Sequence, residues 1–210
     1  MRANREAAPA YGVLVLPGGK VTSRRRARPW QLAQLRTRAL TRSLRRRLGP
    51  DHLVEQVRYR YRGWNAPELD ALADAEAALR RISSRVDRIA VVGHSMGGRV
   101  AVHLAAAHDV AAIVALAPWW PADDATLVPT TCRLRVLHGT ADQWTDPESS
   151  RRQVDSARER GVDAQWTAVD GAGHFMLRRP RRWHRMTADF IAAVDDRSPA
   201  NPERSGTIDG

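Results

Sequence analysis

The stretch RIAVVGHSMGGRVAVHLAAA occupies positions 88–107 of the 210-residue chain. It opens with a continuously apolar run at 89–92, which is typical of a strand buried on both faces. An alanine-rich segment after position 96 favours a helix. Between them lies Gly93-His94-Ser95-Met96-Gly97, a G-x-S-x-G pattern in the strand–turn–helix context of a nucleophile elbow. The stretch therefore predicts Ser95 as a nucleophile held on a sharp turn.

The residues around Ser95 have a physical reason to be there. Side chains at Gly93 and Gly97 would collide with the strand or the helix, so both positions require glycine. The start of the helix offers free N–H groups and the positive end of its dipole to a developing oxyanion. The backbone N–H of Met96, directly after the nucleophile, is therefore expected to be one oxyanion donor.

A serine hydroxyl is a weak nucleophile and needs a base that a third group orients. Residues 136–142, VLHGTAD, predict a strand that runs into a loop carrying Asp142, and residues 171–175, GAGHF, predict a glycine-rich loop carrying His174. The order serine, acid, histidine suits an open α/β sheet, in which functional residues gather beyond the carboxyl ends of the strands. We therefore predict Ser95 as nucleophile, His174 as general base and then acid, and Asp142 as the group that orients His174.

Short apolar runs alternate with helical stretches along the rest of the chain. Strands are expected at 12–16, 53–59, 88–92, 111–116, 133–137 and 163–169, and helices at 29–48, 67–84, 96–107, 147–160 and 180–194. This alternation predicts an α/β fold with an open, mostly parallel six-stranded sheet and helices on both faces. The length suits one domain, expected over 11–195, with disordered ends at 1–10 and 196–210.

Three blocks of the chain resemble those of α/β-hydrolases: GHSMGG at 93–98, LHGTAD at 137–142 and GAGHF at 171–175. They are most similar to the small dienelactone-hydrolase and monoacylglycerol-lipase-like branches. The resemblance covers about 11–194. It implies a carboxylesterase- or lipase-like serine hydrolase, of class EC 3.1.1, that cleaves an ester or related acyl bond through an acyl-enzyme. The same triad also serves enzymes that cleave peptide, thioester or carbon–carbon bonds.

The oxyanion hole needs a second donor, expected from the loop Pro17-Gly18-Gly19-Lys20 after the first strand. Family members often carry His-Gly at the start of this loop, whereas this chain has Pro17-Gly18. We expect Gly19 to provide the donor, with Lys20 as the alternative. A simple tight turn is the competing interpretation of the loop.

Four tryptophans at the ends of predicted strands either line an apolar substrate pocket or cover the core: Trp64, Trp119, Trp120 and Trp144. Only one short helix fits between the strands that end near 116 and begin near 133. We therefore expect a minimal lid or none, and an open cleft that suits a small acyl substrate.

Other polar residues have weaker claims. His94 and His138 are expected to be structural neighbours of the site, and the fallback acids are Asp123, Asp124 and Asp146. No Cys/His cluster, H-E-x-x-H motif or Walker-type loop occurs in the sequence, so neither a metal nor a cofactor is implied.

The formal net charge of +11 invites a nucleic-acid interpretation. The densest arginine cluster, however, alternates with Leu32, Leu35, Leu40, Leu44 and Leu48 at helical spacing, which indicates an amphipathic helix with a solvated basic face. We expect no specific nucleic acid, although a non-catalytic binding protein with an arginine-rich surface is the alternative of another class.

No apolar run spans a bilayer and no signal peptide is evident, so a cytoplasmic location is expected.

Overall fold

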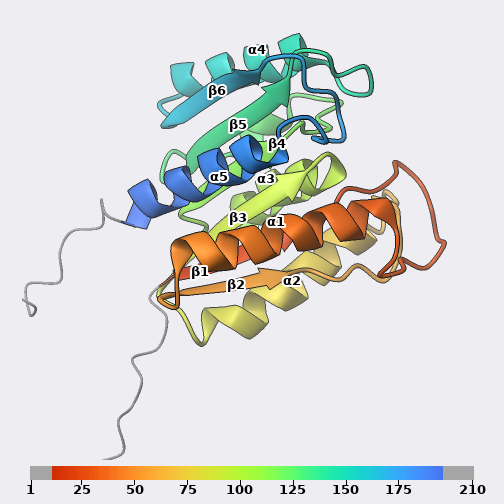
Figure 1. Ribbon diagram of the computed structural model, residues 1–210, viewed down its shortest axis with the longest axis vertical. Helices are drawn as coiled ribbons and strands as arrows, with labels where there is room; N and C mark the ends of the chain where they lie inside the picture. The colour runs from red at the N-terminus through yellow and green to blue at the C-terminus, as the bar shows by residue number, and fades with distance from the viewer. Residues whose placement is uncertain (1–10, 196–210) are drawn as a thin grey trace, which may run out of the picture.

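The structure is a computed structural model that describes residues 11–195. The expected disordered ends, 1–10 and 196–210, lie outside the described residues. Six strands form one sheet in the order β2-β1-β3-β4-β5-β6, and every neighbouring pair is parallel (Figure 1). The strands are β1 (Tyr11–Leu16), β2 (His52–Gln56), β3 (Arg88–His94), β4 (Ala112–Leu116), β5 (Arg133–Gly139) and β6 (Ala164–Val169).

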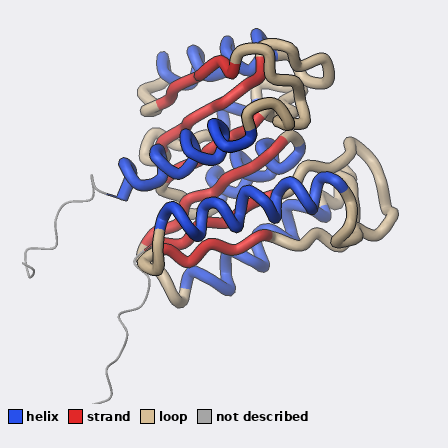
Figure 2. The backbone as a smooth tube through the Cα atoms, viewed as in Figure 1, coloured by secondary structure: helices blue, strands red, loops and turns tan. Residues whose placement is uncertain are grey.

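Helices cover both faces of the sheet, as Figure 2 shows. They are α1 (Leu32–Leu48), α2 (Asp70–Ser83), α3 (Met96–Ala107), α4 (Pro147–Glu159) and α5 (Pro180–Asp195), with a short 3₁₀ turn η1 (Asp124–Leu127). Core residues of α1 and α5 pack on one face of the sheet, and those of α2, α3 and α4 pack on the other. The predicted α/β-hydrolase fold, with an open parallel sheet between two helical layers, is confirmed.

The two-sided core follows from the residue pattern of the central strands. Along β1, Leu14 and Leu16 pack in the core under α2 and α3, whereas Val13 and Val15 pack in the core under α1 and α5. Successive side chains of a strand point to opposite faces, so a strand covered on both sides is apolar at every position. All six residues of β1 are accordingly buried.

Several element boundaries differ from those predicted. The strand expected at 53–59 ends at Gln56, because the chain then turns away and forms isolated bridges between Lys20 and Gly63 and between Arg26 and Tyr61. Helices expected from Pro29 and Pro67 begin three residues later. Strands β3 and β5 each extend two residues further, to His94 and Gly139.

The apolar stripe predicted for the first helix is wrong at its beginning. Leu40 and Leu44 are buried, but Leu32 and Leu35 are 73% and 42% exposed. The first turn of α1 lies beside a cleft at the carboxyl end of the sheet, and Leu32 lines that cleft. This part of the helix is therefore not covered by the core.

Between β4 and β5, η1 is the only helix in the part of the chain that the structure describes, so no lid domain is inserted there. Within the same described range, no helix has the length and apolar character that crossing a membrane requires.

Candidate active site

Ser95 lies on the turn between β3 and α3 in a strained backbone conformation, with φ 54° and ψ −117°. A positive φ is uncommon for a residue other than glycine and persists only where the surroundings enforce it. Here the N–H of Ser95 donates to the carbonyl of Leu116, and the carbonyl of Ser95 accepts from the N–H groups of Gly98 and Trp119 at 2.9 and 3.1 Å. The neighbouring strand and the following loop therefore hold the serine on this turn.

The elbow glycines allow close contact between backbones. A Cβ atom on Gly93 would overlap the carbonyl oxygen of Gly97, and one on Gly97 would overlap the carbonyl oxygen of Leu16. The first collision lies within the elbow, as the sequence predicts. The second involves the end of β1, a strand distant in sequence, so Gly97 also permits the elbow to pack against the neighbouring loop.

The structure brings the three predicted catalytic residues together. His174 Nε2 lies 3.0 Å from Ser95 Oγ, and His174 Nδ1 lies 2.9 Å from Asp142 Oδ2. Ser95 follows β3, Asp142 follows β5 and His174 follows β6, so all three lie beyond the carboxyl ends of parallel strands. Ser95 and His174 are buried, and the side chain of Asp142 is fully buried. Low solvent exposure strengthens the charge interactions within this chain of hydrogen bonds.

Both oxygens of the Asp142 carboxylate are saturated with donors. Oδ1 accepts the N–H groups of Trp144 and Thr145 at 2.8 and 3.0 Å. Oδ2 lies within hydrogen-bond distance of His174, of the Thr145 hydroxyl at 3.0 Å and of His138 Nε2 at 3.1 Å. Burial alone would raise the pKa of Asp142, but the two backbone donors and His174 outweigh it and lower the pKa. Asp142 is thus held as an anion in one orientation.

The two ring nitrogens of His138 contact the Asp142 carboxylate and the Ser150 hydroxyl. Its Nδ1 lies 2.8 Å from the hydroxyl of Ser150, which also accepts the indole N–H of Trp166. Burial is the main cause that lowers the pKa of His138, so its neutral form is favoured. The sequence predicts only a structural neighbour here. The spacing His138-Gly-Thr-Ala-Asp142 on a strand end was the available signal for its contact with the acid.

His94 fixes the backbone of the catalytic histidine. Its Nε2–H donates to the carbonyl of His174 at 2.8 Å. Burial, followed by the nearby His174, lowers the pKa of His94 to about 3. His94 therefore stays neutral and acts as a hydrogen-bonding neighbour rather than a base. On its other side, a Cβ atom on Gly18 would lie 2.9 Å from His94 Nδ1, which leaves no room for a side chain at position 18.

We expect this burial to make the protein sensitive to acid. Between about pH 3 and 6.5 the unfolded chain binds a proton at His94 that the folded chain does not, so stability falls as the pH falls through this window. The loss from His94 is about 1.4 kcal/mol per pH unit. Urea unfolding at pH 7, 6 and 5 measures it. The His94→Gln variant should show a smaller slope between pH 6.5 and 5. An equal slope in both proteins would contradict the assignment.

The two predicted oxyanion donors, Met96 and Gly19, both line the cleft that holds Ser95. Met96 is the first residue of α3, so its N–H has no partner within the helix, and it lines the cleft together with Gly19. Within residues 11–195, no acceptor takes the N–H of Gly19. The N–H of Lys20 instead donates to the carbonyl of Arg62 at 2.8 Å. Lys20 can serve as the donor only by breaking that bond, so the geometry favours Gly19.

The triad opens into a cleft of about 670 Å³. Its walls come from the loop after β1, the first turns of α1, the segment around Tyr59–Arg62 and the loops that carry the triad. The bridges between Lys20 and Gly63 and between Arg26 and Tyr61 tie two of these walls together. The long β1–α1 loop thus forms part of the wall of the cleft.

Two of the four predicted pocket tryptophans line this cleft, and two do not. Trp119 and Trp144 lie in its wall, and the Trp144 ring stacks against His174 with centroids 6.2 Å apart. Trp64 and Trp120 lie in the core and not in the predicted pocket, because these residues are only 3% and 6% exposed. Each lies against α3: Trp64 packs on His103, and the indole N–H of Trp120 donates to the carbonyl of Gly98.

The fallback acids have other partners. Asp146 caps α4 by accepting the N–H of Glu148 at 2.9 Å. Asp124 is buried and forms an ion pair with Arg99 at 2.8 Å. Asp123 precedes η1, where its backbone carbonyl accepts from Thr126. Among the described carboxylates, Asp142 alone contacts His174. No grouping of three potential metal ligands occurs within the described range.

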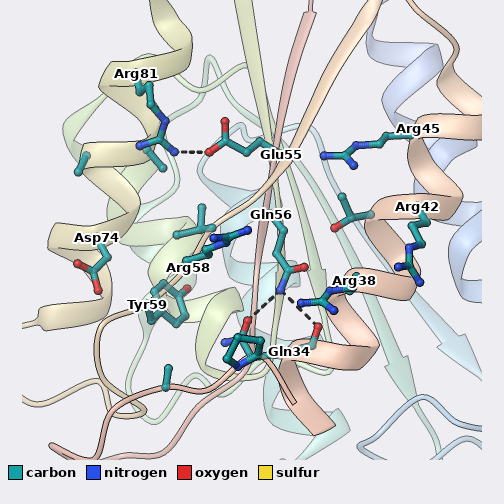
Figure 3. A pocket seen from close by; sticks show the side chains of 16 residues that line it. Gln34, Arg38, Arg42, Arg45, Glu55, Gln56, Arg58, Tyr59, Asp74 and Arg81 are labelled. Atoms are coloured by element: carbon teal, nitrogen blue, oxygen red, sulfur yellow. Dashed lines mark hydrogen bonds and ion pairs between the residues drawn. The ribbon is translucent and has the colours of Figure 1, made fainter. Parts of the chain in front are cut away.

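A larger groove of about 900 Å³ lies between α1 and α2 beside the edge strand β2, and none of the triad residues lines it (Figure 3). Arg38, Arg42 and Arg45 of α1 form one wall. Arg45 donates two hydrogen bonds to the carbonyl of Val54, and Gln56 bonds to Gln34. The basic face of the first helix thus lies along the open edge of the sheet. Charged side chains beside an edge strand oppose its pairing with a strand of another molecule.

The sequence matches a known family along nearly the whole chain. A model described as "Alpha/beta hydrolase family" matches residues 13–201. The chain belongs to the alpha/beta hydrolase family. No sequence among curated proteins matches it.

Solved structures of alpha/beta hydrolases share its fold. Est1E from Butyrivibrio proteoclasticus is 13% identical with a TM-score of 0.66, and the match covers 93% of this chain and 92% of the Est1E chain. A protein of unknown function from Agrobacterium tumefaciens is 16% identical with a TM-score of 0.73, and the match covers 92% of this chain and 91% of that protein. A structure from a study of LipS and LipT, two metagenome-derived lipolytic enzymes, is 16% identical with a TM-score of 0.62, covering 89% and 95%. At these identities the likeness shows a common fold, and the family supports hydrolase activity.

Proposed function

We propose that this alpha/beta hydrolase is a serine esterase that cleaves carboxylic esters through an acyl-enzyme, with Ser95, His174 and Asp142 as its catalytic triad. The observation that carries the proposal is the continuous chain of hydrogen bonds from Ser95 Oγ through His174 to Asp142, at 3.0 and 2.9 Å. A nucleophile, a base within reach of its proton and a group that orients the base are the parts that acyl transfer requires.

In the first half of the reaction, Ser95 Oγ attacks the ester carbonyl as its proton passes to His174 Nε2. The negative charge on the carbonyl oxygen is stabilised by the N–H groups of Met96 and Gly19. The tetrahedral intermediate then collapses, the bond to the alcohol oxygen breaks, and His174 returns its proton to the departing alcohol. Asp142 stabilises the imidazolium during both transfers. Ser95 is left as an acyl ester.

In the second half, a water molecule enters the cleft and loses its proton to His174 as its oxygen attacks the acyl carbonyl. The bond to Ser95 Oγ breaks, the serine regains a proton from His174, and the carboxylic acid is released. The open cleft between the β1–α1 loop and the loops of Trp144 and Phe175 gives water and small substrates access.

Pre-steady-state hydrolysis of p-nitrophenyl butyrate tests the proposal. We expect a burst of p-nitrophenolate that approaches one equivalent per enzyme if deacylation is the slower step. A fluorophosphonate should label the protein once, on the peptide that contains Ser95, and abolish turnover. p-Nitroanilide and thioester analogues of the same acyl chain identify the preferred bond. Folded protein that neither turns over these substrates nor reacts with the fluorophosphonate would refute the proposal and favour a binding protein.

A further inference from the structure

The cleft that holds Ser95 has an uneven distribution of charge. Three cationic side chains line it, and none of its lining residues is an aspartate or glutamate; the cations are Lys20, Arg36 and Arg62. Asp142, the acid of the triad, lies behind His174 with its side chain fully buried. A ligand in this cleft therefore meets positive charge without any exposed carboxylate to oppose it.

Arg36 is the member of this set that contacts an aromatic ring beside His174. It is partly buried on α1, and its guanidinium carbon lies 4.7 Å from the centre of the Phe175 ring. Of the carboxylates that the structure describes, none forms an ion pair with it, and no side-chain hydrogen bond fixes it. Other arginines of the chain do pair with acids: Arg24, Arg60, Arg81, Arg99 and Arg133. Burial, which disfavours the cation, lowers the pKa of Arg36.

Such an arrangement is unfavourable for folding alone, because a cation withdrawn from water without a counter-ion loses solvation energy. Contact with the face of Phe175 offsets part of that loss and orients the guanidinium plane. No acceptor in the described part of the chain bonds to the polar edge of the guanidinium. This is the state expected of an arginine whose counter-ion arrives with a ligand.

Arg36 is also close to the reacting groups. Phe175 directly follows His174, and their ring centroids are 5.4 Å apart. The charge of Arg36 contributes to lowering the pKa of His94, whose Nε2–H holds the backbone of His174. Arg36, Phe175, His174 and Ser95 thus line the same cleft.

We propose that the preferred substrate is an ester that carries a carboxylate and that Arg36 binds this carboxylate while Ser95 attacks the ester carbonyl. The inference rests on the proposed esterase function and adds the substrate class. A planar guanidinium pairs with a carboxylate through two parallel N–H···O bonds, which fixes the orientation of the ligand as well as its charge. Lys20 and Arg62 add a positive field that draws the anion into the cleft.

Matched esters test the substrate class and locate the anion. In the first pair the acyl group carries the charge: mono-p-nitrophenyl glutarate against methyl p-nitrophenyl glutarate. In the second pair the leaving group carries it: 4-acetoxybenzoate against 4-acetoxybenzamide. The readout is the ratio of kcat/KM for the anionic ester over its neutral partner. We expect a ratio of about ten or more in one pair, since hydrogen bonds to charged groups are the stronger ones. The pair that shows it identifies the side of the ester that faces Arg36.

Variants at two positions of α1 test whether Arg36 causes the preference for the anionic ester. Arg36→Gln should reduce the ratio to near unity, and Arg36→Lys, which keeps the charge but not the paired donors, should leave an intermediate value. Arg38→Gln is the matched control, because Arg38 lines the groove beside β2 and not the catalytic cleft. It should keep the wild-type ratio. No anionic preference in either pair, or an unchanged ratio in Arg36→Gln, would overturn the inference while leaving the esterase proposal intact.

A binding measurement separates the two proposals further. Titration calorimetry with monomethyl glutarate, in the Ser95→Ala background, reports recognition of the anion without catalysis. We expect about tenfold weaker binding when Arg36→Gln is added. If binding depends on Arg36 but no ester is hydrolysed by the wild-type enzyme, the anion site stands and the esterase function fails. Binding that is equal with and without Arg36 counts against the anion site.

Discussion

The Ser95→Ala variant should lose at least about 10⁴-fold in kcat for ester hydrolysis, because removing the nucleophile abolishes the acyl-enzyme route. The residual rate comes from the oxyanion donors and from binding alone. Among residues 11–195, His174 is the only side-chain partner of the hydroxyl that the substitution removes, so the fold should persist. Steady-state kinetics with p-nitrophenyl butyrate measure the loss, and urea unfolding verifies the folded state.

A serine outside the cleft provides the control for this experiment. Ser83, at the exposed end of α2, donates only to the carbonyl of Arg80, so Ser83→Ala should keep wild-type turnover and fluorophosphonate labelling. A Ser95→Ala protein that retains more than about a tenth of wild-type kcat would show that another group is the nucleophile.

The Asp142→Asn variant is expected to lower kcat by about 10⁴-fold while KM changes much less. Two backbone N–H groups, of Trp144 and Thr145, require an oxygen at the Oδ1 position, so the amide nitrogen of the asparagine must occupy the Oδ2 position. There it faces His174 Nδ1 as a donor. The imidazole then adopts the tautomer whose Nε2 carries the proton, and that nitrogen can no longer accept the proton of Ser95.

Asp146→Asn is the matched control for the acid. Asp146 lies four residues further along the chain and caps α4, a role that asparagine fills as well as aspartate. We expect near-normal kcat in this variant. Measuring kcat against pH for both variants distinguishes a lost orienting group from a general loss of stability. An Asp142→Asn enzyme with wild-type kcat, or an Asp146→Asn enzyme that loses activity instead, would reassign the acid.

The α/β fold could be predicted because its strands and helices carry local signals. Continuous apolar runs predict β1, β3 and β4, since a strand covered on both faces has no polar position. Glycine at 93 and 97 around Ser95 predicts the elbow from steric constraints within a few residues. Boundaries were less accurate where distant segments set them. β2 ends at Gln56 because the following residues pair with the loop after β1.

The contacts of the candidate site needed the tertiary structure. The sequence alone favours Asp142 over Asp146 by its motif, but only the folded chain shows that Asp146 caps a helix and that Asp124 pairs with Arg99. The tryptophans illustrate the same limit. Trp119 and Trp120 are adjacent in sequence, yet one lines the cleft and the other is buried in the core. Which side of a loop faces solvent depends on what packs against it.

The sequence by itself determined the order of strands and helices and the turn that carries Ser95, because these depend on periodicity and on sterics between near neighbours. Only the tertiary structure decided what surrounds that serine. The ring of Trp144 stacks against His174, and Arg36 meets the ring of Phe175, across separations that no local pattern encodes. The physical reason is that helix α1 and the loops after β5 and β6 approach one another only when the sheet has formed beneath them.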